Sequence, residues 1–111
     1  MNVTRLSTAL TYDPPNHVDM RCLRLQGREA GPSDALWLGL SHLLPGGHTS
    51  LEASPVEKHY LVLDGEVTVV TAEGETALGV WDSCRLAPGE ARRLENRTNR
   101  CASILLAMPL S

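Results

Sequence analysis

Short runs of alternating apolar and polar residues, each closed by turn-forming residues, make up most of this chain. A period of two is typical of half-buried β-strands. The pattern predicts strands at Arg5–Tyr12, Met20–Leu25, Leu36–Leu43, Lys58–Leu63, Val67–Thr71, Thr76–Val80, Ser83–Leu86 and Ala102–Met108. No window carries the apolar stripe of a helix of about ten or more residues. The chain is therefore expected to be all-β.

Glycine, proline, asparagine and aspartate cluster between these runs and mark the turns. Asp64-Gly65 lies between LVL and VTVV, which predicts a tight β-hairpin. Many short strands at close spacing favour a sandwich or a closed barrel. Periodicity alone does not separate these two architectures.

Composition narrows the classes of function. With 111 residues the chain has room for one domain. The net charge is −3 and no basic cluster stands out beyond Arg92-Arg93, so neither nucleic acid nor an anionic membrane is an expected partner. No apolar run reaches the roughly 20 residues of a membrane span. The first residues lack the pattern of a signal peptide, so a cytoplasmic location is expected.

The middle of the chain has a distinctive spacing of two glycines and three polar residues, Gly46, Glu52, Ser54, Lys58 and Gly65. Position for position, this spacing resembles the first motif of the cupin family, G-x5-H-x-H-x3-E-x6-G. The hairpin text HYLVLDGEVTVV is also similar to the "YVLEGE" signature of cupins.

The second cupin motif, G-x5-P-x-G-x2-H-x3-N, falls on Trp81, Ala87, Gly89, Arg92 and Asn96. The resemblance covers about Leu36 to Met108. It implies a double-stranded β-helix, the jelly-roll barrel of RmlC-like cupins. In domain terms it implies one cupin domain over residues 1–111, with N-terminal strands and loops in 1–34 and the barrel core with both motifs in 35–109.

The four positions that hold a metal in many cupins carry Glu52, Ser54, Lys58 and Arg92. Lys58 and Arg92 bring positive charge to the place of a cation, and no imidazole is left there. We therefore expect no metal centre and no cofactor. The three cysteines show no zinc-binding spacing either.

The resemblance places these four side chains inside the barrel, where charges are costly unless paired. Two cations and one carboxylate leave surplus positive charge, which a carboxylate or phosphate ligand would neutralise. The predicted ligand is therefore a small organic anion, with Arg92, Ser54 and Tyr60 as binding residues. An equally weighted alternative is that Glu52, Lys58 and Arg92 form an internal salt-bridge network that plugs the barrel.

Three residues are candidates for catalysis. Lys58, desolvated beside Arg92, is a candidate general base or Schiff-base residue, and Glu52 a candidate acid–base group. His48 is expected in a Pro45–Thr49 loop near the barrel mouth. His17 is expected to approach the same mouth only if the N-terminal segment folds across it.

Strand periodicity puts Lys58, Tyr60 and Val62 on one face, and Glu57, His59 and Leu61 on the other. Trp37 and Trp81 are expected to pack. Because Trp81 stands where the family has glycine, a shaped wall or an interface is a further interpretation.

Three functional hypotheses follow. The first is a metal-free cupin that binds a small organic anion, in its enzymatic form an isomerase or lyase of small-molecule catabolism. The second is a cupin metalloenzyme with a shifted ligand set of His48, Glu52, Glu57 and His59. The third is a non-catalytic, dimeric binding module with a filled barrel. The family resemblance also implies a homodimer paired through edge strands.

Overall fold

The computed structural model describes residues 1–110. This part of the chain contains nine strands and two short 3-10 turns, η1 (Leu6–Thr8) and η2 (Arg28–Ala30). The strands are β1 (Leu10–Tyr12), β2 (His17–Gln26), β3 (Leu36–Thr49), β4 (Lys58–Asp64), β5 (Val67–Thr71), β6 (Gly74–Leu78), β7 (Ser83–Leu86), β8 (Arg93–Glu95) and β9 (Ala102–Pro109). Within residues 1–110 no helix has the length and apolar character needed to cross a membrane.

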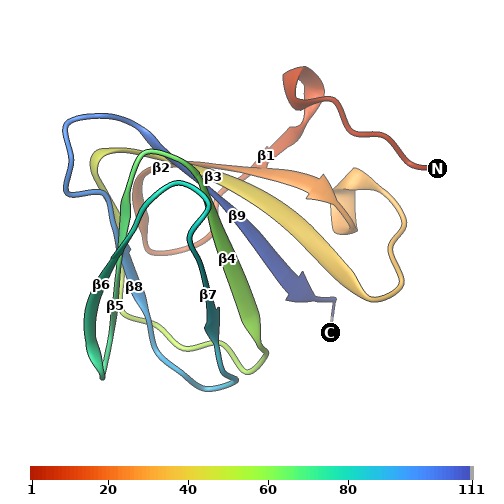
Figure 1. Cartoon of the computed structure of the whole chain (residues 1–111). Coiled ribbons are helices and arrows are strands. Elements are labelled where there is room, and N and C mark those ends of the chain that lie inside the picture. The colour runs from red at the N-terminus through yellow and green to blue at the C-terminus, as the bar shows by residue number, and fades with distance from the viewer. Residues whose placement is uncertain (111) are drawn as a thin grey trace.

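The strands pair antiparallel and curl into a barrel (Figure 1). Their order is β6-β5-β8-β3-β9-β4-β7, and β2 lies on the other side of β3 with β1 beside it. The long strand β3 serves both halves of the barrel, since Leu36–Leu43 pair with β9 and His48 pairs with Glu95 of β8. The protein is thus the all-β jelly-roll barrel that the cupin resemblance implies.

The barrel is filled at one end by aliphatic side chains from facing strands. Leu43, Val62, Val67, Ala102 and Ile104 are fully buried, and they pack in one cluster with five further buried residues. Burial of each larger side chain stabilises the fold by about 1.5–3 kcal/mol. The same strands continue to the other end of the barrel, where they carry the polar residues. The packed aliphatic core holds these strands in place.

The turn after β4 corrects one prediction. Asp64-Gly65 does not close a hairpin, because β4 pairs with β7 and β9 whereas β5 pairs with β6 and β8. The turn instead carries the chain from one half of the barrel to the other. Gly65 has φ +73°, and a Cβ there would lie 2.8 Å from the carbonyl oxygen of Cys101. Only glycine fits this crossing without strain.

Other expectations were wrong in detail. Within the first predicted strand, Leu6–Thr8 form the turn η1 and only the last three residues form β1. Strand β8 was missed, because three residues are too few to show a period. The predicted Pro45–Thr49 loop is the end of β3, which bends at Gly46 with φ +82°. Trp81 does not pack: its side chain is 72% exposed, and its φ of +71° explains why glycine suits this motif position.

Candidate functional site

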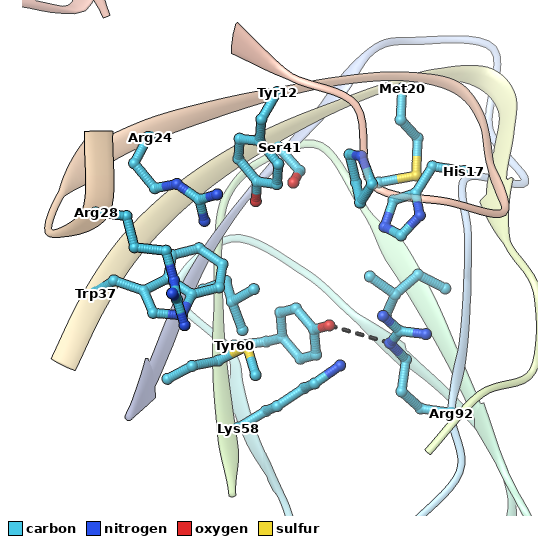
Figure 2. Close-up of a pocket in the computed structure, with 14 residues that line it drawn as sticks. Tyr12, His17, Met20, Arg24, Arg28, Trp37, Ser41, Lys58, Tyr60 and Arg92 are labelled. Carbon is cyan, nitrogen blue, oxygen red and sulfur yellow. Dashed lines mark hydrogen bonds between the residues drawn. The ribbon is translucent and has the colours of Figure 1, made fainter. Parts of the chain in front are cut away.

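A cavity of about 300 Å³ opens at the polar end of the barrel. Figure 2 shows side chains from β1, β2, β3 and β4, and from the segment before β8, converging on it. Its lining includes four cationic side chains and, among residues 1–110, no carboxylate. The polar and aromatic part of the lining includes His17, Arg24, Arg28, Trp37, Lys58, Tyr60 and Arg92. The volume is at the lower end of small-molecule sites.

Arg92 is the most deeply buried cation of the cavity, at 5% exposed. Its backbone is fixed by a bridge to Glu52, in which each amide donates to the other residue's carbonyl at 2.9 and 3.0 Å. The guanidinium Nε donates to the Tyr60 hydroxyl at 3.0 Å, and Nη1 donates to Thr49 Oγ1 at 3.3 Å. Both partners are neutral, so the charge of Arg92 is held in place without being neutralised.

Lys58 is the first residue of β4, two residues before Tyr60 on the inward face. Burial, with the neighbouring Arg92 charge as a second cause, lowers the pKa of its ammonium from 10.5 to about 8. Glu52 opposes this shift only weakly. Lys58 is therefore protonated at neutral pH but releases its proton more readily than an ordinary lysine. The predicted inward and outward faces of β4 are confirmed.

Glu52 lies beside this pair without forming an ion pair with it. The Ser50 hydroxyl and the Asn16 amide hold the pKa of Glu52 below its usual range, with a smaller contribution from Arg92. Among the described residues, no carboxylate oxygen lies within 4.0 Å of a side-chain nitrogen of Lys58 or Arg92. The internal salt-bridge plug considered from the sequence is not formed.

His17 reaches the cavity because the segment between β1 and β2 folds across its mouth. Its Nδ1 lies 2.8 Å from the carbonyl oxygen of Pro15. Burial lowers the pKa of His17, and the charges of Arg92 and Lys58 act in the same direction. The conditional expectation about this residue is therefore met.

Three of the predicted site residues lie outside the cavity lining: Glu52, described above, and His48 and Ser54. Thr49 points inward to Arg92, so the preceding His48 points out of the barrel, and its Nδ1 contacts the Gly46 carbonyl at 3.0 Å. The Ser54 hydroxyl accepts a hydrogen bond from the Val56 amide, and its carbonyl accepts one from Gly89. These contacts give Ser54 a part in shaping the loop. The proposed roles of all three residues in function stay predictions.

The other end of the cavity is aromatic, which the sequence analysis missed. The guanidinium of Arg24 stacks over the rings of Tyr12 and Trp37, at 3.9 and 4.3 Å from their centroids, and pairs with Glu29 at 3.1 Å. Trp37 is 7% exposed, which confirms its packing role. A Cβ on Gly39 would lie 2.7 Å from the Trp37 ring, so glycine makes room for it. The period of β2, which places Arg24 on the face of Met20, was the signal available.

The residues present do not fit the metal centre of metal-dependent cupins. Lys58 and Arg92 occupy two of its four positions as cations. In the shifted set, Glu57 and His59 contact each other and Arg85 on the outer face of β4, away from His48. Within residues 1–110, no three His, Cys, Asp or Glu side chains gather as a metal site. We therefore derive no step that involves a metal.

Comparison with known proteins identifies a relative in sequence and several similar structures. No protein-family model matches the chain. The protein named β-D-galactosidase Rv1717 of Mycobacterium tuberculosis (strain ATCC 25618 / H37Rv) is 44% identical over 108 residues, which cover 97% of this chain and 93% of the relative.

Solved structures share the fold at low identity. The polyketide cyclase RemF of Streptomyces resistomycificus matches 100% of this chain and 80% of its own, with a TM-score of 0.89 and 16% identity. An RmlC-like cupin from Shewanella frigidimarina NCIMB 400 matches 100% and 92%, with a TM-score of 0.81 and 13% identity. The chain therefore has the cupin fold and belongs to the same family as Rv1717.

Proposed function

We propose that this protein binds a small organic anion in the barrel cavity, with Arg92 and Lys58 holding the anionic group. The observation that carries the proposal is the buried Arg92 guanidinium, which has only neutral partners among the described residues. A buried charge without a counter-ion is costly, and a carboxylate or phosphate would neutralise it through charge-assisted hydrogen bonds. Lys58, beside it, adds a second cation for the same group.

The substrate class that we propose is a carbohydrate or a similarly sized hydroxy acid. This suggestion rests on the 44% identity to a relative named as a β-D-galactosidase. The cavity of about 300 Å³ has room for a sugar ring. A lyase or isomerase acting on such an anion is the enzymatic form of the proposal, and Lys58 and Glu52 are its candidate acid–base residues.

Hydrolysis of a β-D-galactoside is a second candidate, favoured by the same relative. Glycoside hydrolases usually need two carboxylates beside the scissile bond. Among the described residues, Glu52 is the carboxylate that influences the pKa values of both Lys58 and His17, and it is the candidate here. Release of nitrophenol from its β-D-galactopyranoside tests this candidate directly, with Glu52→Gln as the variant expected to lose the activity.

Thermal unfolding with D-galacturonate, inorganic phosphate or D-galactose tests the proposed binding. At about a hundredfold excess over Kd, a ligand contributes about 2.7 kcal/mol, which raises Tm by several degrees. We expect this shift with an anion and not with neutral galactose. Arg92→Met and Lys58→Met should each abolish it, whereas Arg21→Met, an exposed arginine on β2, should keep it. Equal shifts in all three variants would contradict the proposal.

A further inference from the structure

His17 presents a free lone pair to the cavity. A carbonyl oxygen only accepts hydrogen bonds, so the contact of 2.8 Å to Pro15 requires the hydrogen of His17 on Nδ1. The lone pair is then on Nε2. The ring lines the cavity on the side of Arg92 (Figure 2). A neutral imidazole of fixed tautomer beside the ligand is suited to take up a proton.

Burial, together with two neighbouring positive charges, keeps His17 neutral. Arg92 and Lys58 act on the ring from the segment before β8 and from β4, and both oppose its protonation, as burial does. The Pro15 carbonyl, which accepts the Nδ1 hydrogen, and the Glu52 carboxylate favour protonation. The pKa of His17 is lowered by these influences together, so its Nε2 is unprotonated at neutral pH.

The sign of the cavity charge decides which reactions it accelerates. A transition state that develops negative charge is stabilised by fixed cations, and one that develops positive charge is opposed by them. Glycoside hydrolysis passes through an oxocarbenium-like cation. Removal of a proton next to a carboxylate passes through an enolate-like dianion. With Arg92 and Lys58 at the site and no lining carboxylate among residues 1–110, the second type is favoured.

We propose that His17 removes the proton next to the carboxylate of a bound galacturonate residue that carries a second sugar on its O4, and that the bond to this second sugar is cleaved by β-elimination. The inference rests on the anion-binding function proposed above, and galacturonate is the anionic counterpart of galactose. His17 Nε2 takes the C5 proton, the C4–O bond breaks, and a C4=C5 double bond forms. The leaving oxygen takes a proton from water while His17 returns its own to solvent, so nothing is oxidised or reduced.

Tyr60 and Arg92 hold the carboxylate in this scheme. Because Arg92 Nε donates to the Tyr60 oxygen at 3.0 Å, the hydroxyl hydrogen of Tyr60 remains free to donate to the ligand. Burial raises the pKa of Tyr60, so the phenol keeps that hydrogen at neutral pH. Arg92, Lys58 and Tyr60 together offer donors to both oxygens of an enolised carboxylate.

Incubation with 4-O-linked digalacturonate tests the inference. The conjugated double bond of the product absorbs in the ultraviolet, and we expect this absorbance to rise with the wild-type protein. His17→Gln should lower the rate by about 100-fold or more, the usual contribution of a general base. It should still be stabilised by D-galacturonate, because Arg92 and Lys58 are intact. His42→Gln, a histidine on β3 bonded to Ser103, is the matched control and should keep the activity.

Four results would overturn the inference, each with a different meaning. Stabilisation by galacturonate without unsaturated product, and without exchange of the C5 hydrogen in heavy water, leaves only the proposed binding. Hydrolysis of nitrophenyl β-D-galactopyranoside without unsaturated product assigns the site to hydrolysis. Absence of stabilisation by any anion removes the proposed function as well. Retention of elimination in His17→Gln would assign the proton transfer to another residue.

Discussion

Arg92 and Arg93 are neighbours in the chain but meet opposite electrostatic environments. Arg93 points outward and pairs with Glu95, which also pairs with Arg97, and Arg97 is bound in turn by Glu75. Arg92 points into the barrel, where its partners are hydroxyl groups. On the surface each of these arginines has a carboxylate, and inside the barrel the arginine has none among the described residues.

The stability of the fold accounts for the outer arginines but not for Arg92. Exposed ion pairs form at little cost and contribute little. A buried guanidinium without a counter-ion lowers stability, because it has lost much of its hydration and gained only neutral hydrogen bonds. A ligand that supplies the missing negative charge accounts for this arrangement. The following predictions test the contrast between the inner and the outer cluster.

The largest effect is expected from Thr49→Val. Thr49 Oγ1 accepts hydrogen bonds from Arg92 Nη1 at 3.3 Å and from the Leu94 amide at 3.0 Å. Valine has nearly the same shape but leaves both buried donors unsatisfied, at about 1–3 kcal/mol each. We expect a loss of about 2–4 kcal/mol in the free energy of unfolding, measured by urea denaturation.

Thr68→Val is the matched control for this prediction. Thr68 on β5 is also buried, at 6% exposed against 1% for Thr49, and within residues 1–110 its hydroxyl has no side-chain hydrogen bond. Its replacement should change the free energy of unfolding by less than about 1 kcal/mol. If the two variants lose the same stability, the neutral hydroxyl is not what supports the charge of Arg92.

The sequence predicted the barrel better than it predicted the pocket. Motif spacing placed Lys58 and Arg92 together inside the barrel, because glycine and asparagine positions fix where the strands turn. Asn96, for example, is fully buried and donates to the carbonyls of Leu43 and Arg100, which ties the last turn to β3.

The walls of the pocket come from β1, β2 and the segment between them, which lie outside the motifs. Whether His17 reaches the cavity depends on how this segment folds across the mouth, and no local pattern encodes that contact. The position of Arg24 between Tyr12 and Trp37 depends likewise on the register of β2 against β3. Such contacts between distant segments are set by tertiary packing.

A smaller effect is expected from titration of Lys58. Its pKa is about 8 in the folded protein and about 10.4 in the unfolded chain. Between these values the unfolded state binds more protons, so stability rises as the pH increases from about 8 towards 10. Allowing for the partial exposure of Lys58, the gain is of the order of 1 kcal/mol.

Comparison with Lys58→Met isolates this gain. Cys22 and Cys84 have pKa values raised by burial and titrate in the same range with the opposite sign, but they are shared by both chains. The difference between the two pH profiles, from urea denaturation at each pH, therefore belongs to Lys58. Anion affinity of the wild type should fall over the same range as the lysine loses its charge. Parallel profiles would mean that Lys58 is hydrated as an ordinary surface lysine.

The smallest effect is expected from Arg97→Met in the outer cluster. Arg97 Nη1 and Nη2 contact the Glu75 carboxylate at 2.7 and 3.0 Å, but both side chains are about half exposed. Water and salt screen the attraction in such exposed pairs, so loss of the pair should leave Tm within about 2 °C of the wild type. The remaining difference should vanish at about 1 M salt, where the Debye length is about 3 Å. Galacturonate should stabilise this variant as it does the wild type. A loss as large as that of Thr49→Val would mean that the outer ion pairs support the fold. The contrast between the outer arginines and Arg92 would then no longer be evidence for a ligand at Arg92.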